Sequence, residues 1–353
     1  VDNHAANEIL QQIYDVEISD GFSYAGKQTA VNDGFRFFNT LFYGTKLTYQ
    51  VALQTPEGTK KTVMLWEKAT EKDKETTEKS KKDTITDNSN RQEDTSKLLF
   101  KKPTWLLHES SQRLRIDEKY AKLAILQIAS FDNRRFSKFY RKAFQLLKDH
   151  QITHLVIDLR NNGGGKVQDA NELMTYLLDK PFTYHFERKK QKLKGLLQYS
   201  QQGKFWLRIT PAIFRFFATT QQDSNVIYHT WHHKAKQYLQ FKGKVFVLTN
   251  GGTFSAAATV ASYLKNLSNS TLIGTETGGS EAGTNALLFP LITLPNSKIQ
   301  VRIPLYYVKY AIGIPDNRRG VLPHFCTQYT LQDVLDRKDL EMEEVYKGVG
   351  NGE

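Results

Sequence analysis

Strand-like and helix-like hydrophobic patterns alternate along this 353-residue chain from about residue 98 onward. Residues 122–131 are apolar enough for a buried strand, and residues 136–150 repeat their apolar side chains at helical spacing. The alternation continues with predicted strands over 153–159, 244–249, 270–274 and 298–304 and with predicted helices over 167–178 and from residue 255. Because strands separated by helices of this length are joined by right-handed crossovers, the pattern predicts an α/β core.

Two segments precede this core. Residues 1–66 read as a small unit with a short amphipathic helix over 7–13 and a β-hairpin around the turn sequence "TPEGTK". Residues 67–97 contain almost no apolar side chain, so they cannot bury enough surface to order themselves. We interpret them as a charged flexible linker or insertion; a charged tract that binds a partner is the alternative.

The overall composition excludes several classes of protein. No apolar run in the sequence approaches the roughly 18 residues that a transmembrane helix needs. The single cysteine, Cys326, excludes an internal disulfide framework and a multi-cysteine metal site, and it is expected to be a small buried hydrophobe. The net charge of +12 favours contact with anionic surfaces without identifying one. The start at Val1, without an initiator methionine or a signal pattern, predicts a fragment or a processed chain.

Residues 181–240 interrupt the alternation with interleaved basic and aromatic side chains. We interpret them as an insertion that caps a cleft. A polyanion-binding module or a membrane-surface site is the alternative, because basic and aromatic residues suit both. His229, His232 and His233 raise the further alternative of a metal site, but no carboxylate or cysteine accompanies them at a firm spacing. No metal is therefore expected.

A glycine-rich loop follows one of the predicted strands, in the sequence "LVIDLRNNGGGKVQDA" over residues 155–170. Consecutive glycines let a backbone approach a ligand closely and turn its N–H groups toward it. A phosphate-binding P-loop is excluded, because Arg160 and Val167 stand where that motif needs a glycine and a serine or threonine. The dinucleotide fingerprint is absent as well. The loop is therefore predicted to donate hydrogen bonds to a single oxyanion.

Ser255 stands at a second strand-to-helix junction, in "VLTNGGTFSAAATVASYLK" over residues 247–265. Taken alone, it is a plausible helix N-cap without further function. At a helix start, however, the amide of Ala256 points to the same region as the serine hydroxyl. A second amide from the glycine loop would complete an oxyanion hole, at the carboxyl ends of parallel strands where α/β proteins bind ligands.

These two loops, together with "STLIGTETGG" and the ending "GVLPHFCTQYTLQDVLDRKDLEMEEV", resemble the tail-specific, or C-terminal-processing, serine peptidase family. The resemblance covers residues 98–347 and implies a crotonase/ClpP-like α/β peptidase core. It further implies that residues 1–66 are part of a β-rich, PDZ-like unit. A secreted, periplasmic or cell-envelope location and a peptide or protein substrate are implied too. No cofactor and no nucleic-acid partner are expected.

The resemblance places the catalytic nucleophile at Ser255 and the oxyanion hole at Gly163, Gly164 and Ala256. Ser280 occupies the position where the Ser–Lys branch of the family has its lysine, so a Ser–Lys dyad is not expected. The tricorn-like branch instead uses an upstream histidine base and an acid before the G-V-x-P turn. Asp316 is the candidate for that orienting acid.

The general base cannot be assigned from the sequence. A histidine outside the chain or an unassigned one within it is expected to serve, and no motif supports His108 as a substitute. We therefore predict a serine endopeptidase that acts through a Ser255 acyl-enzyme. The alternative is a catalytically inactive peptide- or lipid-binding protein on the same fold, since the resemblance extends to the interphotoreceptor retinoid-binding proteins. The natural substrate and the oligomeric state are left open.

Overall fold

The computed structural model describes residues 1–66, 105–189 and 200–350, apart from gaps at 3, 18–21, 45, 47, 55–57, 203–208, 211, 214–215, 217, 224, 237 and 287. The predicted linker over residues 67–97 lies outside the described residues. The chain divides into two compact units. One comprises Val1–Glu17 and Val31–Pro103, and the other comprises Ile18–Ala30 and Thr104–Glu353.

The first unit contains helix α1 (Ala6–Val16), most of helix α2 (Tyr24–Tyr43) and an antiparallel hairpin of strands β1 (Thr48–Gln54) and β2 (Lys60–Trp66). The predicted short helix and the predicted hairpin are therefore confirmed. Helix α2 was not predicted, and with it the unit has more helix than strand instead of being β-rich. A PDZ-like fold for this unit stays a prediction.

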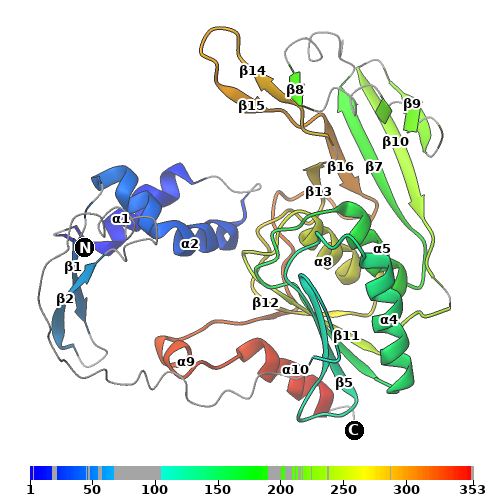
Figure 1. The fold of residues 1–353 in the computed structure, drawn as a ribbon, viewed down its shortest axis with the longest axis horizontal. Helices are drawn as coiled ribbons and strands as arrows, with labels where there is room; N and C mark the ends of the chain where they lie inside the picture. Colours follow the sequence, from blue (N-terminus) through cyan, green and yellow to red (C-terminus); the bar gives the residue numbers. More distant parts are fainter. Residues whose placement is uncertain are drawn as a thin grey trace, which may run out of the picture. The chain divides into compact units, whose positions relative to one another are not determined.

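A seven-stranded sheet forms the centre of the second unit, in the order β17-β12-β11-β6-β5-β4-β3 (Figure 1). Its strands are β3 (Leu107–Glu109), β4 (Gln112–Ile116), β5 (Leu123–Ile128), β6 (His154–Asp158), β11 (Lys244–Thr249), β12 (Thr271–Gly274) and β17 (Phe325–Cys326). The five strands from β17 to β5 are mutually parallel, whereas β4 and β3 continue the sheet in antiparallel pairing. The predicted α/β core is thus confirmed.

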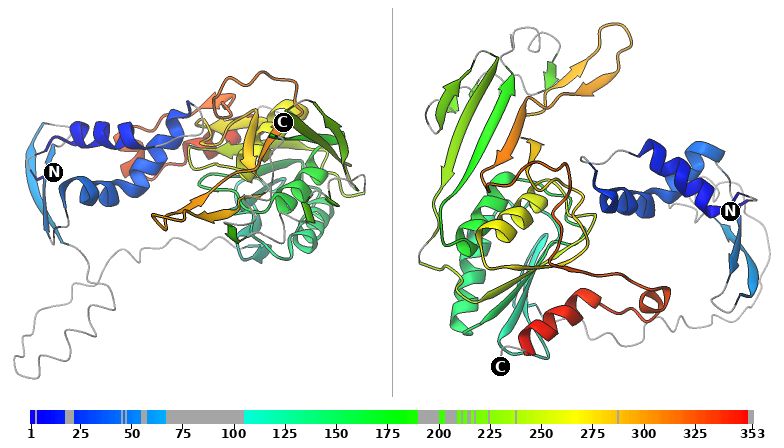
Figure 2. Two further views of the ribbon diagram at one scale, coloured as in Figure 1. Left: turned by 90° about the horizontal axis from the view of Figure 1, so that it is seen from above. Right: turned by 180° about the vertical axis from the view of Figure 1, so that it is seen from behind.

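Helices cover both faces of this sheet (Figures 1 and 2). One face packs against α4 (Phe136–Asp149), α5 (Val167–Leu177) and α8 (Ala256–Leu267), and the other packs against α10 (Leu340–Gly350), which follows the short α9 (Leu331–Leu335). The strand residues alternate between the two cores, as β geometry requires. Leu155 and Ile157 of β6 lie in the first core, and Val156 between them lies in the second.

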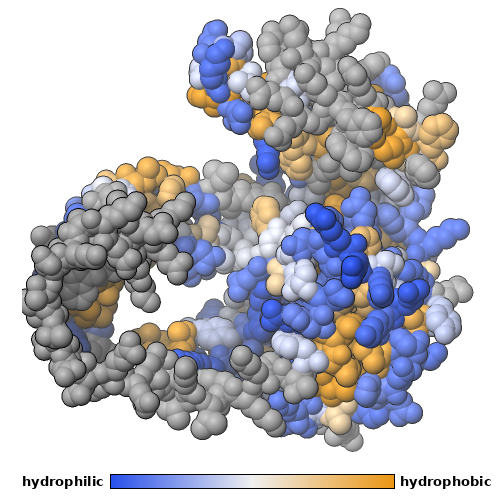
Figure 3. Space-filling model, in the orientation of Figure 1, coloured by the Kyte–Doolittle hydropathy of each residue, from blue (hydrophilic) through white to orange (hydrophobic). Residues whose placement is uncertain are grey.

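Helix α4 illustrates how the sequence pattern produces this layering. Its buried side chains recur at helical spacing and face the sheet: Phe139, Tyr140, Ala143, Phe144 and Leu147. Its other side is solvent-exposed and basic, with Lys138, Arg141 and Lys142. Hydrophilic residues accordingly predominate on this side of the second unit in Figure 3, around a smaller hydrophobic patch.

The segment over 181–240 contributes strands to a second, antiparallel sheet in the order β13-β16-β7-β10-β9. These strands are β13 (Gly283–Ala286), β16 (Tyr306–Tyr310), β7 (Phe182–Lys189), β10 (Val226–His233) and β9 (Thr219–Gln222). A smaller sheet of β15 (Gln300–Arg302), β14 (Leu291–Thr293) and β8 (Ser200–Gln202) lies beyond it. The predicted strand over 298–304 therefore exists, but it belongs to this exposed sheet instead of the core.

Cys326 corrects another expectation. It lies on β17, the two-residue strand at the edge of the central sheet, and it is exposed instead of buried. No described helix has both the length and the apolar character needed to cross a membrane.

Candidate active site

The turn between β11 and α8 is held by hydrogen bonds within the chain. The amide of Asn250 donates to Thr253 Oγ1 at 3.0 Å, and the Thr253 amide donates to the Asn250 carbonyl at 2.9 Å. The Thr253 hydroxyl then donates to the carbonyl of Leu159 at 2.9 Å, and this joins the turn to the end of β6. These hydrogen bonds therefore hold the turn that directly precedes Ser255 in one conformation.

Ser255 has a backbone conformation that is rare for a residue with a side chain, with φ +49° and ψ −121°. Such a conformation costs about 1–3 kcal/mol and persists only where the surrounding structure imposes it. Although Ser255 is at the N-cap position of α8, its side chain makes no capping hydrogen bond. No hydrogen bond joins its hydroxyl to any other described residue. A helix-capping role does not account for this serine.

The glycine loop lies directly against Ser255. A Cβ atom on Gly164, which has φ +102°, would come within 2.7 Å of Ser255 Cβ and 3.0 Å of the Ala256 nitrogen. Only glycine fits at such a close approach. The Phe254 amide donates to the carbonyl of Asn162 at 2.9 Å and fastens the two loops together. The structure therefore brings Gly164 of the predicted oxyanion loop against Ser255 and Ala256.

The backbone amides around Ser255 differ in whether they are available. The Gly164 amide donates to the side-chain oxygen of Asn162 at 2.9 Å. By contrast, the amides of Gly163 and Ala256 donate to no residue in the described part of the chain. Gly163 is exposed and has open space around its Cα atom. Each of the two loops thus carries one amide, that of Gly163 or that of Ala256, without a hydrogen-bond acceptor among the described residues.

Of the other residues predicted from the sequence, one lies near Ser255 and one lies at the surface. Ser280 is buried and forms a bridge with Gly320, and its neighbour Gly279 packs so closely that an added Cβ would lie 3.0 Å from the Ser255 nitrogen. Asp316 is exposed, and its carboxylate accepts hydrogen bonds from Tyr307 Oη at 3.3 Å and from the Arg318 amide at 2.9 Å.

None of the nine histidines hydrogen-bonds to Ser255 in the described structure. His108 lies on β3, four strand positions from β11 in the sheet order. At about 4.8 Å per strand, this separation is roughly 19 Å. His229 and His233 are on one face of β10, and His232 is on the other, so the three cannot meet at one ion. No described group of metal-ligating side chains is arranged to hold a metal ion.

An aromatic-lined cavity of about 90 Å³ lies one helical turn beyond Ser255. Thr259, whose hydroxyl donates to the Ser255 carbonyl at 3.1 Å, is on its wall, as is Val167 just after the glycine loop. The second sheet supplies the rest of the wall, mainly with apolar and aromatic side chains: Tyr184, Phe186, Trp231, His233, Thr284, Val308 and Tyr310, with Gln168 and Asn171 from α5. We call this cavity the aromatic pocket.

His233 is neutral in this pocket at ordinary pH. Burial lowers its pKa to about 4, and the neighbouring His232 adds to that effect. Its ring stacks on Phe182 at 4.9 Å between centroids and forms a 3.2 Å hydrogen bond with Asn171 Nδ2. The pocket is therefore uncharged. Its residues come from α5, α8, β7, β10, β13 and β16, and no local sequence signal joins them.

Arg160 connects the glycine loop to the C-terminal helix. It forms ion pairs with Asp158 at 2.9 Å, Asp339 at 2.8 Å and Glu341 at 3.1 Å. The Glu341 carboxylate is buried and also accepts hydrogen bonds from Thr327 and Tyr329. Burial lowers the pKa of Arg160, but the carboxylates of Asp158 and Asp339 outweigh it and raise that pKa above its usual value. Asp158 and Arg160, which precede the glycines, thus stabilise the fold.

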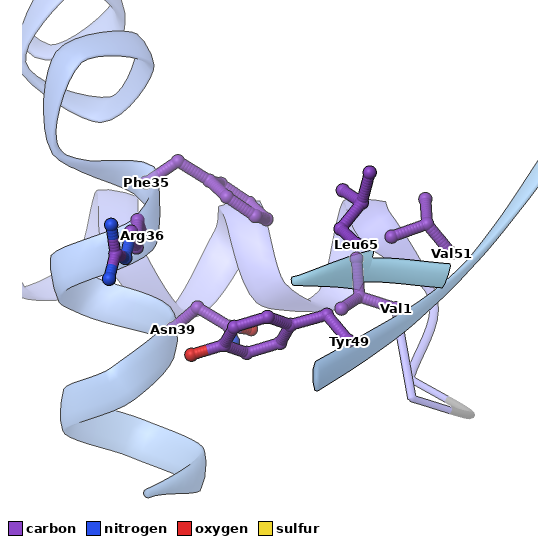
Figure 4. Close-up of a pocket in the computed structure, with 7 residues that line it drawn as sticks. All are labelled: Val1, Phe35, Arg36, Asn39, Tyr49, Val51 and Leu65. Atoms are coloured by element: carbon purple, nitrogen blue, oxygen red, sulfur yellow. The ribbon is translucent and has the colours of Figure 1, made fainter. Parts of the chain in front are cut away.

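A separate cavity of about 250 Å³ lies within the first unit, between α2 and the hairpin (Figure 4). It is lined by Val1, Phe35, Arg36, Asn39, Tyr49, Val51 and Leu65. Among the described residues, this lining contains no cysteine, serine, histidine or carboxylate side chain.

Comparison with known proteins gives a family and a fold. The model of peptidase family S41 matches residues 122–325, which contain both loops. Among solved structures, mature CPAF complexed with lactacystin has a TM-score of 0.62 at 15% identity, over 99% of this chain and 75% of that chain. A second structure of mature CPAF has a TM-score of 0.56 at 14% identity, covering 94% and 72% of the two chains. At identities this low, the TM-scores show a shared fold and nothing more.

The photosystem II D1 C-terminal processing protease is a more distant neighbour. It has a TM-score of 0.40 at 19% identity, and the match spans 58% of this chain but only 42% of that one. Among curated proteins, none matches the sequence significantly. The family model, however, covers more than half of the 353 residues. The chain therefore belongs to peptidase family S41, and it is placed by that membership among the serine-type peptidases.

Proposed function

We propose that this protein is a serine endopeptidase in which Ser255 Oγ attacks the carbonyl carbon of a peptide bond. The observation that carries this proposal is the strained backbone of Ser255, whose hydroxyl makes no hydrogen bond to a described residue and whose Cβ atom packs against Gly164. Active sites are where strained backbone of this kind concentrates. An N-cap serine without function would not need such a conformation.

The oxyanion of the tetrahedral intermediate would be held by backbone amides on both loops. Gly163 and Ala256 supply the free amides. The Gly164 amide already donates to Asn162, and the absence of a side chain on Gly164 leaves room for the substrate. Donors fixed in advance at such a site lower the barrier most effectively, because they need no reorganisation during reaction. Collapse of the intermediate expels the amine, and water then hydrolyses the Ser255 ester.

The general base takes the Ser255 proton and returns it to the leaving amine. We propose that it is a histidine, outside this chain or brought to Ser255 only when substrate binds, since no described histidine is bonded to Ser255. Asp316 stays the proposed orienting acid. The extracytoplasmic location likewise rests on the family resemblance and stays a prediction.

The aromatic pocket is the proposed site for the substrate side chain next to the scissile bond. Its uncharged, largely apolar wall favours an apolar side chain, because a buried charge without a partner is strongly disfavoured. Its volume of about 90 Å³ suits a branched aliphatic side chain better than an aromatic ring. For comparison, a protein cavity that holds benzene, a single aromatic ring, measures about 150 Å³.

Labelling with a fluorophosphonate probe tests the nucleophile. The wild-type protein should be labelled, and Ser255→Ala, with an unchanged circular dichroism spectrum, should not. Labelling that persists in Ser255→Ala would remove this serine from the mechanism. A folded wild-type protein that is never labelled would instead favour either the inactive binding protein or a general base that lies outside this chain.

Matched peptides test the pocket. Cleavage should be faster after leucine than after aspartate or tryptophan. Thr284→Phe, which fills the pocket from β13, should shift the preference from leucine to alanine by roughly tenfold to a hundredfold, the range expected when a few methylene groups are excluded. An unchanged preference in this variant would place the substrate side chain elsewhere.

A further inference from the structure

Asp169 is a fully buried carboxylate in the first turn of α5, four residues after Gly165. Its Oδ1 atom accepts hydrogen bonds from Tyr140 Oη at 2.7 Å and from Gln112 Nε2 at 2.8 Å. Its Oδ2 atom is also buried, and no described residue donates to it. A buried carboxylate with one oxygen unpaired is costly, so its presence needs a reason beyond packing.

The hydrogen bonds of Asp169 close a ring that contains the glycine loop. Gln112 Oε1 accepts from Asn133 Nδ2 at 2.8 Å, and Asn133 is two residues beyond Phe131. The Phe131 amide donates to the Gly164 carbonyl at 2.8 Å, and the Phe131 carbonyl accepts from the Lys166 amide at 2.5 Å. From Lys166 the chain runs directly into the first turn of α5 and back to Asp169.

This ring determines where the glycine loop lies. The backbone of Gly164 is so close to Ser255 that an added Cβ would be 2.7 Å from Ser255 Cβ, which leaves no slack between the loops. Small displacements of groups around a reacting atom are enough to lower a reaction rate by orders of magnitude. The members of the ring outside the loop are Gln112 of β4 and Phe131 and Asn133 of the segment before α4, while Tyr140 of α4 supports Asp169 from the side.

We propose that Asp169 is a positioning residue that holds the oxyanion loop against Ser255 in its ionised form. The proposal rests on the proposed function, because it concerns the geometry of the same site. An ionised carboxylate accepts shorter and stronger hydrogen bonds than a neutral acid or an amide. Protonation of Asp169 would therefore loosen the ring without breaking it.

The charged and titratable groups that act on Asp169 are Tyr140 from α4 and Lys166, which directly precedes α5. Burial raises the pKa of Asp169 to about 6, while the hydrogen bonds from Tyr140 and Gln112, the nearby backbone amide of Asn133 and the charge of Lys166 oppose that rise. The pKa of Tyr140 is held well above its usual range by burial and by Asp169, so Tyr140 stays a neutral donor. The loop should therefore tighten as the pH rises through about 6.

Labelling rates test the proposal in the full chain. Asp169→Asn keeps the shape of the side chain and a neutral acceptor, so its glycine loop should be held at every pH as that of the wild type is at low pH. We expect fluorophosphonate labelling at pH 8 to slow roughly tenfold and the acid side of the pH profile to become shallower, because only the titration of the general base remains. Glu172→Gln is the matched control: it removes a carboxylate from the same helix, outside the ring, and should label at the wild-type rate. Equal rates and equal pH profiles for Asp169→Asn and wild type would overturn the proposal.

A second measurement does not depend on catalysis. Amide hydrogen exchange of residues 163–167, followed at pH 8 in a Ser255→Ala background, should be several-fold faster with Asp169→Asn and unchanged with Glu172→Gln. Unchanged exchange with Asp169→Asn would show that the carboxylate does not hold the loop. If the exchange result is obtained but no variant is labelled, the positioning role stands and the peptidase function fails.

Discussion

Asn161 and Asn250 hold the two active-site loops together through a reciprocal pair of hydrogen bonds. The backbone N–H of Asn161 donates to Asn250 Oδ1, and the side-chain Nδ2 of Asn250 donates to Asn161 Oδ1, both at 2.8 Å. Asn250 Oδ1 also accepts from the Gly252 amide at 3.0 Å, within the turn that leads to Ser255. The pair thus joins the start of the glycine loop to the turn that leads to Ser255.

Removing either member of the pair should slow labelling. Asn161 has φ +58°, so Asn161→Gly is the suitable change, because glycine accepts this conformation while losing the side chain. We expect roughly tenfold slower fluorophosphonate labelling for Asn161→Gly and for Asn250→Ala. In a double-mutant cycle the two changes should couple by about 1–2 kcal/mol, as contacting hydrogen-bonded residues do. Strict additivity would show that the pair does not act as a unit.

The neighbouring glycines Gly163 and Gly164 should respond differently to alanine. At Gly164 the new Cβ would lie 2.7 Å from Ser255 Cβ at a φ of +102°, so Gly164→Ala should abolish labelling and lower the melting temperature. At Gly163 no atom lies within 4 Å of the new Cβ, so Gly163→Ala should stay folded and keep most of its labelling rate. Similar losses in both variants would contradict the arrangement of the loop against Ser255.

Arg160 should matter for stability more than for chemistry. Arg160→Met leaves the Glu341 and Asp158 carboxylates, whose side chains are only 5% and 9% exposed, without their cation. Loss of one partner from a buried ion pair costs about 3–5 kcal/mol. We expect the melting temperature to fall by about 10 °C in thermal unfolding. Lys338→Met, which removes an ion pair with Asp333 at the surface, is the control and should leave it nearly unchanged.

Sequence patterns predicted the core because burial there repeats with the period of each element. Helix α4 and strand β6 follow such patterns closely. Helix α2 was missed for the same reason, since only Val31 and Asn39 of its twenty residues are buried. Cys326 was placed in the core on the general behaviour of free cysteine, but β17 is a short edge strand.

For the site, the residues of the two loops are contiguous in sequence, so motif and glycine content were enough to predict them. The Asn161–Asn250 pair and the ring around Asp169 are not predictable in this way, because their members are separated by up to 89 residues and share no pattern. The aromatic pocket combines side chains from six elements that only the second sheet brings together. The sequence and the structure leave the general base unassigned, because no described histidine hydrogen-bonds to Ser255.

Backbone strain at Ser255 predicts an unusual order of stabilities. A φ of +49° disfavours any residue with a Cβ, so Ser255→Ala should unfold at nearly the wild-type temperature. Ser255→Gly should relieve the strain and gain about 1 kcal/mol, after allowing for the greater flexibility of glycine in the unfolded chain. Chemical denaturation of the two variants measures the difference. A glycine variant less stable than the alanine variant would argue against strain at this position.

The burial of Asp169 predicts that stability depends on pH in a direction opposite to that of most carboxylates. Its pKa is raised from 3.8 to about 6 in the folded protein. Between these two values the folded state keeps a proton that the unfolded state has released, so this residue's contribution to stability falls as the pH rises. Above pH 6 the loss is complete and amounts to up to about 3 kcal/mol, at roughly 1.4 kcal/mol for each pKa unit.

Asp169→Asn removes this dependence. The variant should match the wild type in denaturant unfolding near pH 4 and should be more stable above pH 7, although it labels more slowly there. A gain in stability with a loss of activity is expected when a strained or costly group is retained for function. A purely structural Asp169 would give the reverse result at neutral pH, because its replacement would weaken the fold. If Asp169→Asn is less stable than the wild type at pH 8, the carboxylate is a structural residue and its effect on labelling is secondary.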